Sequence, residues 1–77
     1  MQLKTTFMGY DMNEVLKRFE RLNNILDQMD EGKVSKEMAL QLFDALAAEP
    51  FKKQLTGYDR KAVEAQFADI RRQLEAM

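Results

Sequence analysis

Hydrophobic residues recur at alternating spacings of three and four in two stretches of the chain, one near each end. This period places the apolar side chains on one face of a helix and predicts two amphipathic helices with heptad-like a/d seams. An ordinary bundle core and a coiled coil both fit seams of about two and a half heptads. The seam residues are Val15, Phe19, Leu22 and Leu26 in the first helix and Val63, Phe67, Ile70 and Leu74 in the last.

A third stretch, residues 34–48, is apolar around most of its circumference, which predicts a middle helix buried on more than one side. Ser35 is suited to cap this helix, and Pro50 is suited to end it before a short turn over residues 51–55. No segment alternates apolar and polar residues as a half-buried strand would. We therefore expect an all-α fold, a small three-helix bundle that runs up, down and up as a single domain over residues 1–77.

The chain contains an internal repeat. A shift of 48 positions aligns residues 3–29 with residues 51–77 without a gap, and eight of the 27 aligned pairs are identical. Two amphipathic helices can share their apolar spacing by chance, but these also share Gly-Tyr-Asp at the same offset, which indicates a duplication. We call these segments copy one and copy two. The first and last helices would then be parallel neighbours, with both triplets at the same end of the bundle.

Each Gly-Tyr-Asp triplet has the character of a helix start. Asp11 and Asp59 are suited to be N-caps, whose carboxylates accept hydrogen bonds from the first turn. Glu14 stands three residues after Asp11 and would complete a capping box in copy one. Tyr10 and Tyr58 precede the caps and are spaced to pack on a valine of the first helical turns, as hydrophobic staples.

The residues just before each tyrosine are candidates for an exposed loop tip. Gly9 and Gly57 would permit a backbone turn with positive φ. Phe7 and Met8 in copy one and Leu55 in copy two would then project at the end of the bundle and contact a membrane or a protein partner. The alternative is that these side chains pack on the bundle end as ordinary core, because a small chain has few apolar residues to spare.

Charge and composition exclude several classes of function. The 77 residues include 12 basic and 13 acidic side chains and no histidine, cysteine or tryptophan, so Cys/His metal sites and histidine-based catalysis are ruled out. No phosphate-binding loop, carboxylate pair or nucleophile motif is present, so we expect no enzyme activity, no metal and no cofactor. Basic residues such as Arg18 alternate with acids, which predicts a solvated, salt-bridged surface and no nucleic-acid binding.

Two features of the chain bear on its location. No apolar run reaches the roughly 18 residues of a membrane-spanning helix. The N-terminal segment lacks the apolar stretch of a signal peptide. A cytoplasmic location is expected.

The two triplets with their flanks, LKTTFMGYDMNEVLKRF and EPFKKQLTGYDRKAVEAQF, resemble the N-terminal domain of the DivIVA family of bacterial cell-division and cell-pole scaffolds. The aligned copies cover 54 of the 77 residues. The resemblance implies a non-enzymatic helical module, a parallel dimer in the family. In the family, the loop before the Gly-Tyr-Asp triplet touches the membrane through an aromatic residue beside a basic one. It also implies, as in some members, that the tyrosine and nearby acids bind arginine-bearing peptides of partner proteins.

Carried onto this chain, the resemblance places the loop aromatic at Phe7, with Leu55 in the matching position. The neighbouring basic residue is replaced by Met8 in copy one and by Thr56 in copy two. Each copy keeps one of the two acids of the peptide site. The residues it places at the peptide site are Tyr10 and Glu20 in copy one and Tyr58 and Glu64 in copy two.

The function that the resemblance implies is a bacterial scaffold or protein–protein interaction module with a helical or peptide partner. A homodimer and contact with a membrane surface are both open. The competing interpretation is a small regulatory or adaptor protein unrelated to cell division, whose likeness to the family reflects only the shared physics of helix starts. A helix-turn-helix DNA-binding protein ranks third.

Overall fold

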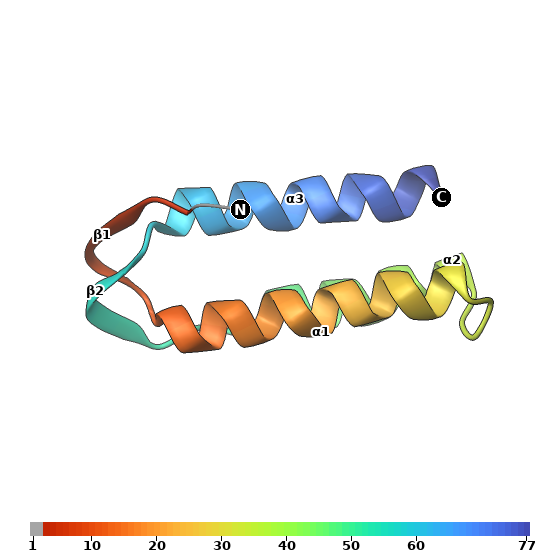
Figure 1. The fold of residues 1–77 in the computed structure, drawn as a ribbon, viewed down its shortest axis with the longest axis horizontal. Helices are drawn as coiled ribbons and strands as arrows, with labels where there is room; N and C mark the ends of the chain where they lie inside the picture. Colours follow the sequence, from red (N-terminus) through yellow and green to blue (C-terminus); the bar gives the residue numbers. More distant parts are fainter. Residues whose placement is uncertain (1–2) are drawn as a thin grey trace.

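The computed structural model describes residues 3–77, which form three helices and two strands. In chain order these are β1 (Thr5–Tyr10), α1 (Met12–Asp30), α2 (Lys36–Ala48), β2 (Lys53–Tyr58) and α3 (Arg60–Ala76). Helices α1 and α3 start at the same end and run in the same direction, and α2 returns against both (Figure 1). The molecule is elongated, with extents of 40 × 18 × 16 Å, and the strands form one end of it.

The prediction of an all-α fold is wrong, because β1 and β2 pair in a two-stranded sheet and make the fold mixed α/β. These strands occupy the segments that were expected to be a loop and a short turn. Each strand is six residues long and has no alternating pattern of apolar and polar residues. The strands lie 48 residues apart and form only when the bundle brings them together, so the local sequence carries little signal for them.

The two strands cross each other. The register places Thr5, Phe7 and Tyr10 of β1 opposite Tyr58, Thr56 and Lys53 of β2. Along this ladder the residue numbers run in opposite senses, so the pairing is antiparallel. Tyr10 also pairs with Tyr58, at the point where both strands end and their helices begin. Here the two chain segments run in the same direction, as the helices that follow them do. The bend of each strand therefore points away from the bundle (Figure 1).

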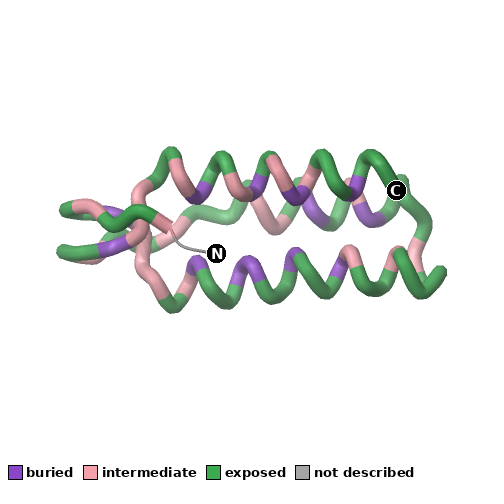
Figure 2. The backbone as a smooth tube through the Cα atoms, turned by 45° about the horizontal axis from the view of Figure 1, so that its top comes forward, coloured by how far each residue is buried: buried purple, intermediate pink, exposed green. Residues whose placement is uncertain are grey.

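The core lies where the three helices face one another, as the buried positions in Figure 2 show. Ala39 and Phe43 of α2 complete a core to which α1 and α3 contribute their seams. The rings of Phe19 and Phe67 meet edge to face at its centre, with centroids 5.0 Å apart. The buried seam residues are Val15, Phe19, Leu22, Val63, Phe67, Ile70 and Leu74, with Leu26 partly buried. The seams therefore close within one chain.

Helix α2 packs on two sides and leaves its third side exposed. Only Ala39 and Phe43 are fully buried in it, whereas Met38 and Leu42 are exposed. In a three-helix bundle each helix contacts two neighbours and keeps a third side toward solvent, and α2 keeps an apolar outer side. The prediction that α2 is buried on more than one side is confirmed, because α2 contacts both α1 and α3.

Candidate interaction site

The candidate site is built around the point where Gly9 and Gly57 cross. A Cβ atom on Gly9 would lie 2.6 Å from the carbonyl carbon of Gly57, and one on Gly57 would lie 2.3 Å from the carbonyl oxygen of Tyr10. Backbone atoms occupy the space that any side chain would need, so only glycine permits this crossing. The expected positive φ at these glycines is wrong: among residues 3–77 it occurs at Met8 and Gly32.

Two backbone hydrogen bonds outside the strand pairing connect the copies at this crossing. The backbone N–H of Asp11 donates to the carbonyl oxygen of Lys52 at 2.7 Å, and that of Asp59 donates to the carbonyl oxygen of Lys4 at 2.6 Å. The donors are 48 positions apart, and so are the acceptors. The crossing therefore has the approximate two-fold symmetry of the repeat. A backbone carbonyl of each copy accepts a hydrogen bond from the residue that precedes the other copy's helix.

All three helices begin at a side-chain cap. The carboxylates of Asp11 and Asp59 accept hydrogen bonds from backbone N–H groups three residues later, at 3.0 and 3.1 Å. The hydroxyl of Ser35 accepts a corresponding bond at the start of α2, at 3.1 Å. The first N–H groups of a helix have no acceptor within the helix, and each cap side chain supplies one. The caps therefore fix where each helix begins and, for Asp11 and Asp59, where the preceding strand ends.

Glu14 does not form the capping box that its spacing suggested. The backbone N–H of Asp11, the partner a capping box requires, already donates to Lys52. The Glu14 carboxylate instead accepts from the backbone N–H of Lys52 at 2.8 Å, and the side-chain oxygen of Gln54 accepts from the N–H of Met12 at 2.7 Å. The long-range pairing of the copies thus overrides a local motif.

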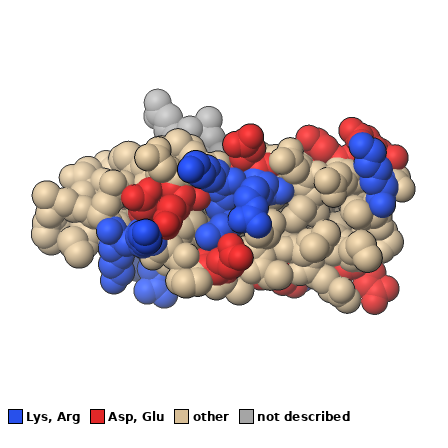
Figure 3. Space-filling view, turned by 90° about the horizontal axis from the view of Figure 1, so that it is seen from below, with Lys and Arg blue, Asp and Glu red and all other residues tan. Residues whose placement is uncertain are grey.

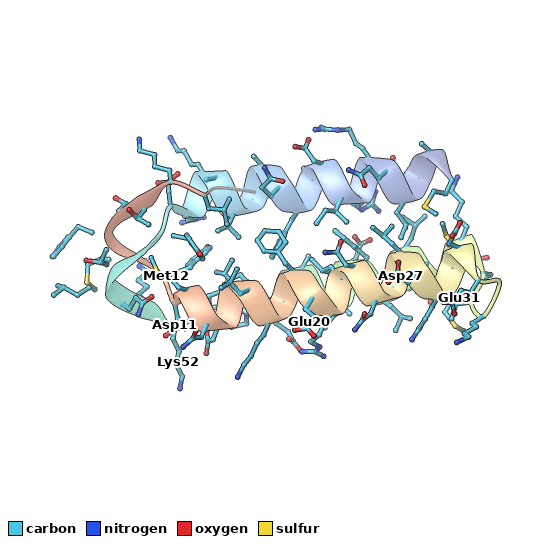
Figure 4. The ribbon with its side chains drawn as sticks, viewed as in Figure 1. Asp11, Met12, Glu20, Asp27, Glu31 and Lys52 are labelled. Atoms are coloured by element: carbon cyan, nitrogen blue, oxygen red, sulfur yellow. The ribbon has the colours of Figure 1, made fainter. Side chains whose placement is uncertain are left out.

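Three apolar side chains project beyond the crossing, and we call them the apolar tip: Phe7, Met8 and Leu55. Their exposed fractions are 74%, 49% and 67%. Met8 has a φ of 57°, in the left-handed region that is uncommon for a methionine. Figure 4 shows side chains at the bends of the strands pointing away from the bundle, and Figure 3 shows no charged group at the outermost part of this end. The end of the molecule is therefore an uncharged, apolar surface.

Lysines stand at the base of the apolar tip. Three exposed lysines lie where the strands begin, beside the helix entrances: Lys4, Lys52 and Lys53. None of them forms an ion pair with another described residue. Figure 3 shows basic groups where the uncharged end meets the helices. We call these three residues the lysine rim. Among the acids close to it, Asp11 and Asp59 are engaged as helix caps, and the Glu14 carboxylate accepts from the backbone N–H of Lys52.

The tyrosines and acids expected to form a peptide site do not gather at the tip. The Tyr10 ring packs on Phe51 with centroids 4.8 Å apart, and both tyrosines are half-buried. Glu20 is exposed farther along α1, roughly 12 Å from the start of the helix (Figure 4). Glu64 binds Arg60 of the same helix at 3.0 Å, and this hydrogen bond raises the pKa of the guanidinium.

Arg18 positions the segment that leads into β2. Its side chain donates to the backbone carbonyls of Leu46 and Glu49 at 2.7 and 2.9 Å, and its guanidinium lies 4.3 Å from the centre of the Phe51 ring. Arg18 is only 8% exposed, so its assignment to a solvated surface is wrong. The sequence did hold a signal, because α2 has no basic residue in its last turn and its final carbonyls need donors from elsewhere.

Within residues 3–77, the structure has neither a pocket nor a group of acidic, histidine or cysteine residues that could hold a metal ion. The helices of this part of the chain are all too short or too polar to span a membrane. No family model, curated protein or solved structure matches the chain. The resemblance to the DivIVA family therefore stays a prediction.

Proposed function

We propose that this chain is a non-enzymatic scaffold module that docks on an anionic membrane surface through its apolar tip. The observation that carries the proposal is the exposure of Phe7 and Leu55, the two most exposed large hydrophobic residues in the described part of the chain. Small domains can bury little apolar surface, so leaving two such side chains outside the core favours a binding role for them.

The crossing holds the apolar tip in one shape before it meets a partner. The two glycines lock the strands in backbone contact, and the matched hydrogen bonds of Asp11 and Asp59 close both sides. A surface that is already ordered loses little conformational entropy on binding. The tip can therefore act as a rigid wedge although it contains only three apolar side chains.

The lysine rim favours an anionic membrane over a second copy of the tip. Lys4, Lys52 and Lys53 would repel the same residues of another molecule, whereas each lysine near an anionic leaflet contributes about 1 kcal/mol of attraction. A phenylalanine or leucine adds roughly 1.5–3 kcal/mol when it is fully buried. The sum corresponds to weak, reversible docking, which several linked modules would strengthen.

A scaffold also needs a protein partner, and the exposed side of α2 offers a surface for one. Met38 and Leu42 lie one helical turn apart and are both exposed. A helical segment of a partner could pack on them while the apolar tip is docked. The setting in bacterial cell division and polarity rests on the resemblance to the DivIVA family alone.

Co-sedimentation with vesicles tests the proposed function. The unmodified protein should bind vesicles of mixed phosphatidylcholine and phosphatidylglycerol, more weakly as salt rises, and should bind pure phosphatidylcholine poorly. The double variant Phe7→Ser with Leu55→Ser should lose binding at least about tenfold while its circular dichroism stays unchanged.

Leu42→Ser is the matched control, because it removes an exposed leucine from α2 and leaves the tip intact. It should bind the anionic vesicles as the unmodified protein does. Equal binding by the folded double variant, or no binding by the unmodified protein, would show that the apolar tip does not dock on membranes.

A further inference from the structure

The apolar tip contains an oxidisable sulfur atom. The chain has no cysteine and six methionines, so thioethers are its sulfur groups. Among residues 3–77, Met8, Met38 and Met77 are exposed to nearly the same extent, at 49%, 52% and 51%. Met8 alone of the three belongs to the tip, since Met38 lies on α2 and Met77 follows the end of α3.

We propose that Met8 is an oxidative modification site, at which conversion to methionine sulfoxide releases the apolar tip from its docking surface. This inference rests on the proposed function, because it assigns a regulation to the same tip. The oxidant is a peroxide, and the reaction needs no group from the protein besides the thioether.

The chemistry balances without a further reactant. The thioether sulfur donates an electron pair to one oxygen of hydrogen peroxide, an S–O bond forms and the O–O bond breaks. After proton transfer the products are the sulfoxide and one molecule of water, so sulfur is oxidised by two electrons and the peroxide is reduced. Methionine sulfoxide reductases reverse the change, which makes it usable as a switch.

The position of Met8 decides what oxidation changes. The sulfoxide is polar and strongly hydrated, and it would stand beside Phe7 on the uncharged surface that the proposed docking buries. Because Met8 is already half exposed, its oxidation leaves the buried core untouched. Thr56 occupies the matching position of copy two and carries no sulfur, so the switch belongs to one strand only.

The test combines peroxide treatment with vesicle co-sedimentation. Peptide mapping by mass spectrometry first shows which methionines have become sulfoxides. Oxidised unmodified protein should lose about tenfold or more of its binding to phosphatidylcholine–phosphatidylglycerol vesicles and recover it after treatment with methionine sulfoxide reductases. Met8→Leu should bind equally well before and after peroxide.

The double variant Met38→Leu with Met77→Leu is the matched control, because it removes the two other exposed methionines of residues 3–77 and keeps Met8. It should lose binding on oxidation as the unmodified protein does. Binding that persists when Met8 is a sulfoxide, or that is lost equally by oxidised Met8→Leu, would overturn the switch and leave the membrane proposal intact. Failure of both the unoxidised protein and Met8→Leu to bind vesicles would overturn both proposals.

Discussion

Copy one and copy two are nearly equivalent at the crossing and differ along their helices. At the crossing, β1 and β2 have the same sequence of exposed and buried positions, and the backbone hydrogen bonds of Asp11 and Asp59 match. Along the helices, copy one buries Arg18 and Ile25, where copy two has Gln66 partly exposed and Gln73 exposed.

The difference follows from the single helix between the copies. A two-fold arrangement offers two equivalent sides, but the chain supplies only one α2. Its C-terminal end lies against the side of α1 that carries Arg18. The copies thus keep the Gly-Tyr-Asp triplet where both must build one crossing, and they differ where only one of them receives a partner.

The largest effect is expected at the crossing glycines. Gly9→Ala and Gly57→Ala should each lower the free energy of unfolding by at least about 3 kcal/mol, because the added Cβ meets backbone atoms that cannot yield without separating the strands. Urea denaturation measures both. Gly32→Ala is the control, with a positive φ but open space around it, and should cost only about 1 kcal/mol. A crossing glycine that tolerates alanine as well as Gly32 does would contradict the crossing.

The next effect tests the asymmetry of the helices. Arg18→Gln puts the residue of copy two into copy one and should destabilise the fold by about 2–3 kcal/mol, since the carbonyls of Leu46 and Glu49 lose a charged donor. The reciprocal Gln66→Arg should change stability by less than about 0.5 kcal/mol. Equal effects in urea denaturation would mean that α2 does not distinguish the copies.

The helix caps test the equivalence of the copies at a smaller magnitude. Asp11→Ala and Asp59→Ala should each cost about 1 kcal/mol, because each leaves one first-turn N–H without its acceptor. Thermal unfolding followed by circular dichroism compares them directly. A cost confined to one copy would show that the two helix entrances are not equivalent.

The helices were predictable from the sequence because their signals are local. The three- and four-residue spacing marks α1 and α3, and Asp11 and Asp59 stand where these helices start. The strands were not predictable, since each forms against a segment 48 residues away. A glycine before a helix can permit either a positive φ or the close approach of two backbones. Only the fold shows that Gly9 and Gly57 permit a close approach.

The candidate site was partly predictable for the same reason. Phe7, Met8 and Leu55 were candidates because they stand just before the Gly-Tyr-Asp triplets, and all three lie exposed. Arg18 was missed because a charged residue on a helix is usually solvated, and its acceptors are 28 and 31 residues away in the sequence. Whether the apolar tip docks on a membrane stays a prediction.

The smallest effect is a dependence of stability on pH. The hydrogen bonds from Arg71 lower the pKa of Asp44 below its ordinary value of 3.8, so the Asp44–Arg71 contact stabilises the fold above that pH and is lost as the pH falls through the lowered pKa. The contribution should be small, because both side chains are partly exposed to solvent. Urea denaturation between pH 6 and pH 2 should show a smaller loss for Asp44→Asn than for the unmodified protein.

The most direct test of the crossing is a nuclear Overhauser measurement between the backbone protons of Gly9 and Gly57, in uniformly labelled protein and in an isotope-filtered mixture of labelled and unlabelled chains. Strong contacts between the two glycines are expected in the uniform sample and none between chains in the mixture, because one chain supplies both copies. Absence of the contact, or its appearance only between chains, would contradict a crossing formed within a single molecule.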